Sequence, residues 1–183
     1  MRISLLGADG RRELEIHRYP LIVYVLIPLV AVILQSWLPR ALGMWLPPWA
    51  SRWALFDLPL LVTVYFALGR RNPMQGTLMG ALMGLFQDAM THYPIGLNGI
   101  AKTVVGYLGA SIGVRVDVDN HTIRLLLNFG FSMLASAIYL VVARFLLGLE
   151  IEWRGLAELA KAVINAGIAA VLFPMLDRFR VRE

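Results

Sequence analysis

The sequence predicts an all-α integral membrane protein, a bundle of six membrane-spanning helices, and three observations lead to this prediction. First, 58% of the residues are hydrophobic, well above the roughly 45 to 50% of soluble domains. Second, these residues gather in six apolar segments, most of them near the roughly 20 residues that a helix needs to cross a bilayer. Third, arginines concentrate in alternate connections between the segments, as in multi-span membrane proteins.

Three regions follow one another along the chain. Residues 1–19 form a basic N-terminal segment, residues 20–177 the membrane domain, and residues 178–183 a basic tail. Alternating apolar residues flank Asp9-Gly10, so the first segment is either a short hairpin or a disordered basic arm. The first apolar run is long enough to remain as an anchor, and no cleavable signal is expected. Because the chain has no cysteine, disulfides and cysteine metal sites are excluded.

The expected spans cover residues 20–38, 54–68, 73–90, 95–114, 122–147 and 156–176. The second span is the shortest. The connection before it is rich in proline and tryptophan. There Trp49 and Trp53 share a helical face after Pro48, which predicts a short helix at the membrane interface.

The third span carries a repeat of small residues that ends in a carboxylate. Gly76, Gly80, Gly84 and Asp88 are four residues apart, so they lie along one side of a helix. Interior glycines weaken a helix in water, but in a bilayer they allow a neighbouring helix to approach closely. The glycines therefore either pack helices of this chain or form a face that docks a partner, and Asp88 needs a partner or a water-filled space.

The fourth span repeats this pattern at heptad spacing, with Gly99, Gly106 and Gly113. Lys102 lies on the same side of the helix. The third and fourth spans are therefore expected to form a close helical hairpin. In this hairpin the long side chain of Lys102 is expected to reach Asp88 and pair with it.

The distribution of arginine sets the predicted orientation. Six spans place both termini on one side, and eleven arginines fall on that side against three on the other, so both termini are expected in the cytoplasm. Topology and lipid contact then account for the net charge of +5, and no nucleic-acid partner is expected. The cytoplasmic arginines are Arg2, Arg11, Arg12, Arg18, Arg70, Arg71, Arg115, Arg124, Arg178, Arg180 and Arg182, and the opposite ones are Arg40, Arg52 and Arg154.

The same topology places six charged residues of the spans in the outer half of the membrane. Three acids and three bases at similar depth predict a polar cluster of zero net charge that opens outward. For the last three residues of the set, a position at the headgroup boundary is an equally simple explanation. The set consists of Asp57, Asp88, Lys102, Arg144, Glu158 and Lys161.

Enzymatic chemistry is not expected. A membrane protease needs paired catalytic groups or a metal motif, whereas His17, His92 and His121 lie in separate connections. Asp57 and Asp88 could form a carboxylate pair, but no activating motif accompanies them. The sequence predicts no catalytic residue, no cofactor and no metal.

Asp57-Leu58-Pro59 opens the second span, the glycine series follows in the third, and Tyr107-Leu108 lies in the fourth. With these features the central part of the chain resembles the bacterial rod shape-determining protein MreD family. The resemblance implies a non-enzymatic inner-membrane component of the cell-elongation complex, which supports cell shape and peptidoglycan synthesis. Its partners would be MreC, most directly, with RodA and its penicillin-binding protein, MreB and membrane lipids. It also implies a fold similar to the substrate-binding subunits of energy-coupling-factor transporters. The matching features, in residues 55–113, are Asp57-Leu58-Pro59, the series Gly76, Gly80, Gly84, Leu85 and Asp88, and the segment Gly96 to Gly109 with Tyr107-Leu108.

Two functions follow from these observations. In the first, the chain is a scaffold whose small-residue faces and outer polar cluster receive a helix of MreC. In the alternative, it is the small-molecule-binding subunit of an energy-coupling-factor type transporter, and the outer charges enclose a vitamin-like ligand. The spaced alanines expected in the first span of such a subunit are missing, since Ala31 stands alone.

Overall fold

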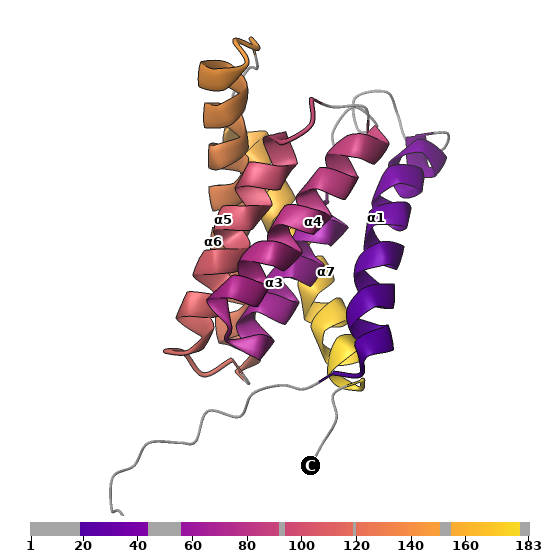
Figure 1. Cartoon of the computed structure of the whole chain (residues 1–183), viewed down its shortest axis with the longest axis vertical. Coiled ribbons are helices and arrows are strands. Elements are labelled where there is room, and N and C mark those ends of the chain that lie inside the picture. The colour runs from indigo at the N-terminus through magenta and orange to yellow at the C-terminus, as the bar shows by residue number, and fades with distance from the viewer. Residues whose placement is uncertain (1–18, 44–55, 92–93, 119, 151–154, 180–183) are drawn as a thin grey trace, which may run out of the picture.

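The computed structural model describes residues 19–43, 56–91, 94–118, 120–150 and 155–179, and this part of the chain is all-helical. The predicted all-α class is thus confirmed for these residues, and one helix overlaps each of the six expected spans. The N-terminal segment and the proposed interfacial helix after Pro48 lie outside the described residues. The helices (Figure 1) are α1 (Leu21–Gly43), α3 (Leu58–Arg70), α4 (Pro73–Thr91), α5 (Leu97–Gly113), α6 (His121–Val141), which continues as the π-helical turn η1 (Val142–Leu146), and α7 (Gly155–Asp177).

Three of the described helices are long and apolar enough to cross a membrane. They are α1 over Leu21–Leu38, α6 with η1 over His121–Leu146, and α7 over Gly155–Asp177. Large apolar side chains such as Leu26 and Leu29 of α1 and Val171 of α7 are exposed on these helices. A soluble monomer rarely exposes apolar surface of this extent, and the three helices are consistent with a membrane protein.

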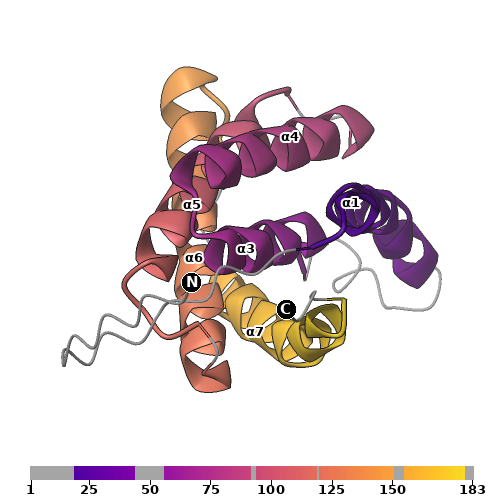
Figure 2. The same cartoon turned by 60° about the horizontal axis from the view of Figure 1, so that its bottom comes forward.

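Helix α3 is shorter, and it occupies the middle of the bundle. Its 13 residues rise by about 20 Å, less than the roughly 30 Å hydrocarbon core of a bilayer. Every residue from Pro59 to Gly69 is buried. Figure 2 shows α3 surrounded by α1, α4, α5, α6 and α7, all of which it contacts. An apolar helix that is covered on all sides needs neither full membrane length nor a polar face.

Capping fixes where α3 and α6 begin. The side chain of Asp57 accepts a hydrogen bond from the backbone N–H of Leu60, and Pro59 occupies the first turn of α3. Asn120 accepts in the same way from the N–H of Thr122 at the start of α6. Arg71 has a left-handed backbone conformation, with φ of 54°, and ends α3.

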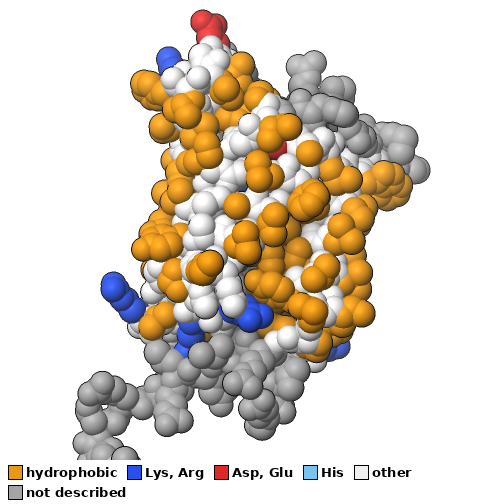
Figure 3. Space-filling view, viewed as in Figure 1, with side chains coloured by type: hydrophobic (Ala, Val, Ile, Leu, Met, Phe, Trp, Pro, Cys, Tyr) orange, Lys and Arg blue, Asp and Glu red, His pale blue; other side chains and the backbone are white. Residues whose placement is uncertain are grey.

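The start of α1 and the end of α7 lie at the same end of the bundle (Figure 1). In Figure 3 apolar side chains cover the middle of the visible face, and basic side chains gather near this lower end. An apolar band with basic residues beyond one edge is the surface that a membrane-spanning bundle presents.

Candidate functional site

The glycines of α4 lie against the backbone of α5. A Cβ atom built on Gly76, Gly80 or Gly84 would overlap the backbone carbonyl of Gly106, Lys102 or Asn98, respectively. These contacts repeat at each turn, so the two helices approach closely along most of their length. Small residues allow this approach in membrane helices.

The glycines of α5 complete the same interface and extend it to α3. Gly106 lies against the backbone of Gly76, and Gly99 lies against the side chain of Leu85. A Cβ atom on Gly113 would come within 2.6 Å of the carbonyl oxygen of Leu68 on α3. The small-residue faces are therefore filled by this chain's own helices and do not form an open docking face.

Asp88 caps the start of α5. Its fully buried carboxylate accepts hydrogen bonds from the backbone N–H groups of Gly96 at 2.9 Å, Asn98 at 3.1 Å and Gly99 at 3.2 Å. The amide Nδ2 of Asn98 donates to the same carboxylate at 2.8 Å. A negative charge here satisfies the free N–H groups of the first helical turn and faces the positive end of the helix dipole.

Lys102 pairs with Asp57. The ammonium Nζ lies 2.7 Å from the Asp57 carboxylate, and only 1% of the Lys102 side chain is exposed. The expected pair of Lys102 with Asp88 was wrong, because Asp88 is held by the start of α5, whereas Asp57 begins α3, which packs on α5. Asn98 joins the two carboxylates indirectly, since its Oδ1 accepts from Lys102 Nζ at 3.3 Å while its Nδ2 donates to Asp88.

Amide and hydroxyl side chains extend the arrangement to the remaining helices. The backbone N–H of Asp57 donates to Asn165 Oδ1 of α7 at 2.9 Å, and Asn165 Nδ2 donates to Ser132 Oγ of α6 at 3.2 Å. Gln35 of α1 donates to the carbonyl of Phe56 and accepts from the N–H of Leu58. We call this set the buried polar network, and its members are Gln35, Asp57, Asp88, Asn98, Lys102, Ser132 and Asn165.

Only half of the expected six-residue cluster comes together. Asp57, Asp88 and Lys102 belong to the buried polar network. Arg144 is exposed on η1, so its inclusion in the cluster was wrong. The charged groups of Glu158 and Lys161, which are one helical turn apart on α7, lie 3.8 Å from each other, and about a quarter of each side chain is exposed. These two form a partly exposed pair of the kind expected near a headgroup boundary.

A second cluster lies at the other end of the bundle and was missed in the sequence. Arg124 of α6 donates to Asp177 of α7 through Nη1 at 2.6 Å and Nη2 at 3.2 Å. The hydroxyl of Tyr65 donates to the same carboxylate at 2.9 Å, and that of Tyr19 donates to Tyr65 at 2.9 Å. The available signal in the sequence was Asp177, a single acidic residue beside the basic residues that follow the last span. Arg124 had been counted only as a determinant of topology.

Both clusters use their charges to join helices. The carboxylates accept from N–H groups or pair with a cation, and none of the three buried acidic and basic residues of the network is open to solvent. Within the described residues, no three histidine, aspartate or glutamate side chains gather in a way that could hold a metal ion. The arrangement is suited to fixing helix positions.

Comparison with family models, curated proteins and solved structures found no match to this chain. The functional argument therefore depends on the chain's own residues.

Proposed function

We propose that this chain is a non-enzymatic scaffold of the bacterial cell-elongation complex, of the kind represented by the MreD family. In this proposal it is a six-span inner-membrane protein with both termini in the cytoplasm. It docks MreC and, through MreC, the glycosyltransferase RodA with its penicillin-binding partner and the filament protein MreB. Through these contacts it supports peptidoglycan synthesis and cell shape.

One observation supports the proposal best: the three charged side chains of the buried polar network are all bound by groups of this chain. Lys102 and Asp57 are both more than nine-tenths buried and form an ion pair, and Asp88 accepts from backbone N–H groups at the start of α5. Catalysis or transport would require such groups to meet a substrate. In this chain the side chains of the buried polar network instead connect the helices to one another. A bundle held together in this way is rigid, as a scaffold must be.

The same contacts weigh against the vitamin-binding alternative. A ligand in an outward-facing pocket would need access to the charges that recognise it, and the charge of Lys102 is already matched by Asp57 at 2.7 Å. We therefore retain a single functional proposal. The transporter reading serves as an outcome of the test below.

The docking surface proposed here differs from the glycine faces that the sequence suggested. Since α5 covers the glycines of α4, a partner helix must dock on an outer face of the bundle. Each outer helix offers an exposed apolar position for a test: Leu29 on α1, Leu82 on α4, Tyr107 on α5, Leu126 on α6 and Val163 on α7.

The experiment introduces a photo-crosslinking amino acid at each of these five positions, one at a time, in cells that express the full chain. We expect one helix to crosslink to a single-span protein with a large domain outside the membrane. The matched control is the same amino acid at Ala162, which is 1% exposed and should give no intermolecular crosslink. Crosslinks to a transporter ATPase, or to no component of the cell-wall machinery from any helix, would overturn the proposal.

A further inference from the structure

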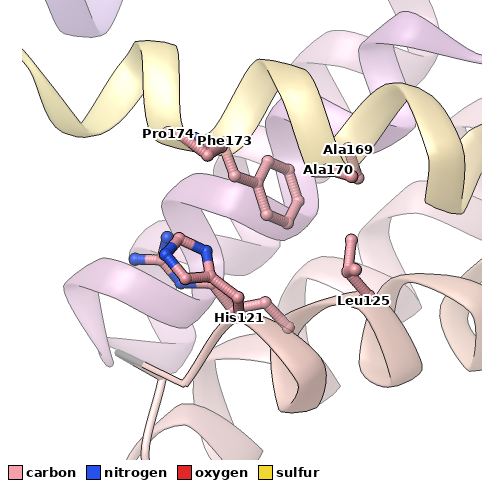
Figure 4. Close-up of a pocket in the computed structure, with 7 residues that line it drawn as sticks. His121, Leu125, Ala169, Ala170, Phe173 and Pro174 are labelled. Carbon is pink, nitrogen blue, oxygen red and sulfur yellow. The ribbon is translucent and has the colours of Figure 1, made fainter.

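A cavity of about 290 Å³ lies between the first half of α6 and the second half of α7. In Figure 4 Phe173 of α7 and Leu125 of α6 project toward each other across it, and His121 lies near one end. Ala170 and Pro174 are exposed, so the cavity opens to the surface of the bundle. Its lining is apolar except at one end: Leu125, Ala169, Ala170, Phe173 and Pro174, with His121 and Arg124.

The polar end of the cavity carries hydrogen-bond donors. The guanidinium of Arg124 has five N–H groups, of which three donate to Asp177 and to the carbonyl of Val118 in the described part of the chain. The other two N–H groups, one on each terminal nitrogen, have no acceptor among the residues that the structure describes. His121 is the first residue of α6, where the helix dipole is positive, and the exposed Arg178 directly follows Asp177.

The cavity wall also contains a backbone acceptor. Pro174 has no N–H, so it cannot donate to the carbonyl of Ala170, which a residue at this position of a helix normally does. In the membrane no bulk water replaces the missing donor. Ala170 and Pro174 both line the cavity, which places this carbonyl beside the space that a ligand would fill.

We propose that this cavity binds an anionic phospholipid of the cytoplasmic leaflet. The phosphate lies at His121 and the free N–H groups of Arg124, a headgroup hydroxyl donates to the carbonyl of Ala170, and part of one acyl chain packs on Leu125 and Phe173. A basic pocket between helices on the cytoplasmic side is a known setting for such headgroups. The assignment of the leaflet depends on the proposed topology, whereas binding of the anionic lipid does not.

The size of the cavity agrees with this occupant. Pockets for small molecules usually measure about 300 to 1,000 Å³, so 290 Å³ is at the lower limit. A headgroup with the upper part of one chain fits a space of this size, and the rest of the lipid lies along the exposed apolar surface of α7. An apolar wall with a single cationic end matches a lipid better than a compact soluble anion.

The test measures lipid binding to the purified full chain by native mass spectrometry, with phosphatidylglycerol and phosphatidylcholine of identical acyl chains. We expect the wild type to bind phosphatidylglycerol about tenfold more tightly. The substitution Ala170→Trp fills the cavity and should abolish this preference. The matched control is Ala160→Trp, at another exposed alanine of α7, which should keep it.

A further variant tests the polar end of the cavity separately from its apolar wall. His121 is exposed, so His121→Ala should leave the fold intact and weaken phosphatidylglycerol binding alone. Equal affinity of the wild type for the two lipids, or equal losses in Ala170→Trp and Ala160→Trp, would overturn the proposal. If glycerol 3-phosphate displaced the bound lipid, the occupant would be a soluble anion and the lipid proposal would be overturned. None of these measurements involves MreC. The lipid proposal can therefore fail while the scaffold proposal stands, and the scaffold proposal can fail while the lipid proposal stands.

Discussion

Lys102 and Asp57 are each almost completely buried, so removing one charge leaves the other without a partner inside the bundle. We expect Lys102→Met to lower the free energy of unfolding by about 3 to 5 kcal/mol, because an uncompensated carboxylate remains. Asp57→Asn leaves an uncompensated lysine but keeps an oxygen that can cap α3. The measurement is the free energy of unfolding of the purified protein in lipid bicelles.

The combination of both substitutions tests whether the pair acts as a unit. Lys102→Met with Asp57→Asn removes both charges, and we expect this double variant to be more stable than Lys102→Met alone by about 1 to 3 kcal/mol. If the two losses simply add, the two side chains are not coupled and the ion pair does not carry the stability assigned to it.

Asp88 should act through its four donors. In Asp88→Ala the N–H groups of Gly96, Asn98 and Gly99 lose their acceptor, at a cost of about 1 to 3 kcal/mol for each buried group left unsatisfied. We expect a clear fall in the thermal midpoint, measured in detergent. Glu150→Gln changes an exposed carboxylate and should leave the midpoint unchanged. Similar midpoints for both variants would contradict the capping role.

At this scale the sequence identified Asp57, Asp88 and Lys102 but assigned the wrong partner. Spacing along a helix shows which face a residue occupies, and it placed Asp88 and Lys102 on facing helices. It could not show that Asp88 lies close enough to the start of α5 to be taken by backbone N–H groups. Asn165 and Gln35 escaped notice as partners of α3 for a related reason, because their contacts join helices distant in the sequence.

At the scale of helices, the glycines of the α4/α5 interface give a matched comparison. A methyl group on Gly80 meets the backbone of Lys102, whereas one on Gly167 meets nothing within 4 Å. We expect Gly80→Ala to destabilise the protein by about 1 to 3 kcal/mol or more, since backbone atoms cannot move aside easily. Gly167→Ala should be neutral or stabilising by up to about 1 kcal/mol, because alanine favours the helix.

Unfolding in bicelles measures both variants. If Gly80→Ala were as stable as Gly167→Ala, the close approach of α4 and α5 would be wrong.

The positions of the helices could be read from the sequence, because apolar runs, prolines and capping residues are local signals. The central place of α3 could not. The sequence showed only that the second span is short. The burial of α3 on all sides depends on how the other five helices surround it. The glycine repeats predicted a close hairpin, but the sequence left open whether this chain or a partner fills the face.

For the molecule as a whole, the proposed orientation can be tested with topology reporters. Alkaline phosphatase inserted after Gly148, in the connection before α7, should be active because this connection is expected outside the cytoplasm. Green fluorescent protein fused after Glu183 should fluoresce, as should an insertion after Asp117. The opposite pattern at the first two sites would reverse the assignment and move the lipid cavity to the outer leaflet.

The sequence predicts the fold class more directly than it predicts the function. Composition and apolar periodicity decide the fold class, since a chain this apolar must place its side chains in a bilayer or a core. The second cluster, of Tyr19, Tyr65, Arg124 and Asp177, could not be predicted from the sequence, because it joins the start of the domain to its end. The scaffold function remains a prediction that depends on partners.

The last helix has a consequence for how the protein is made. Helix α7 supplies Asn165 to one cluster and Asp177 to the other, and both residues are synthesised after the groups that they bind. Until α7 enters the membrane, Arg124 lacks its carboxylate and the backbone N–H of Asp57 lacks its side-chain acceptor. A nascent chain stalled before residue 155 should therefore expose polar groups within the lipid. Membrane proteases could recognise such a chain as incomplete, so only full-length chains would accumulate.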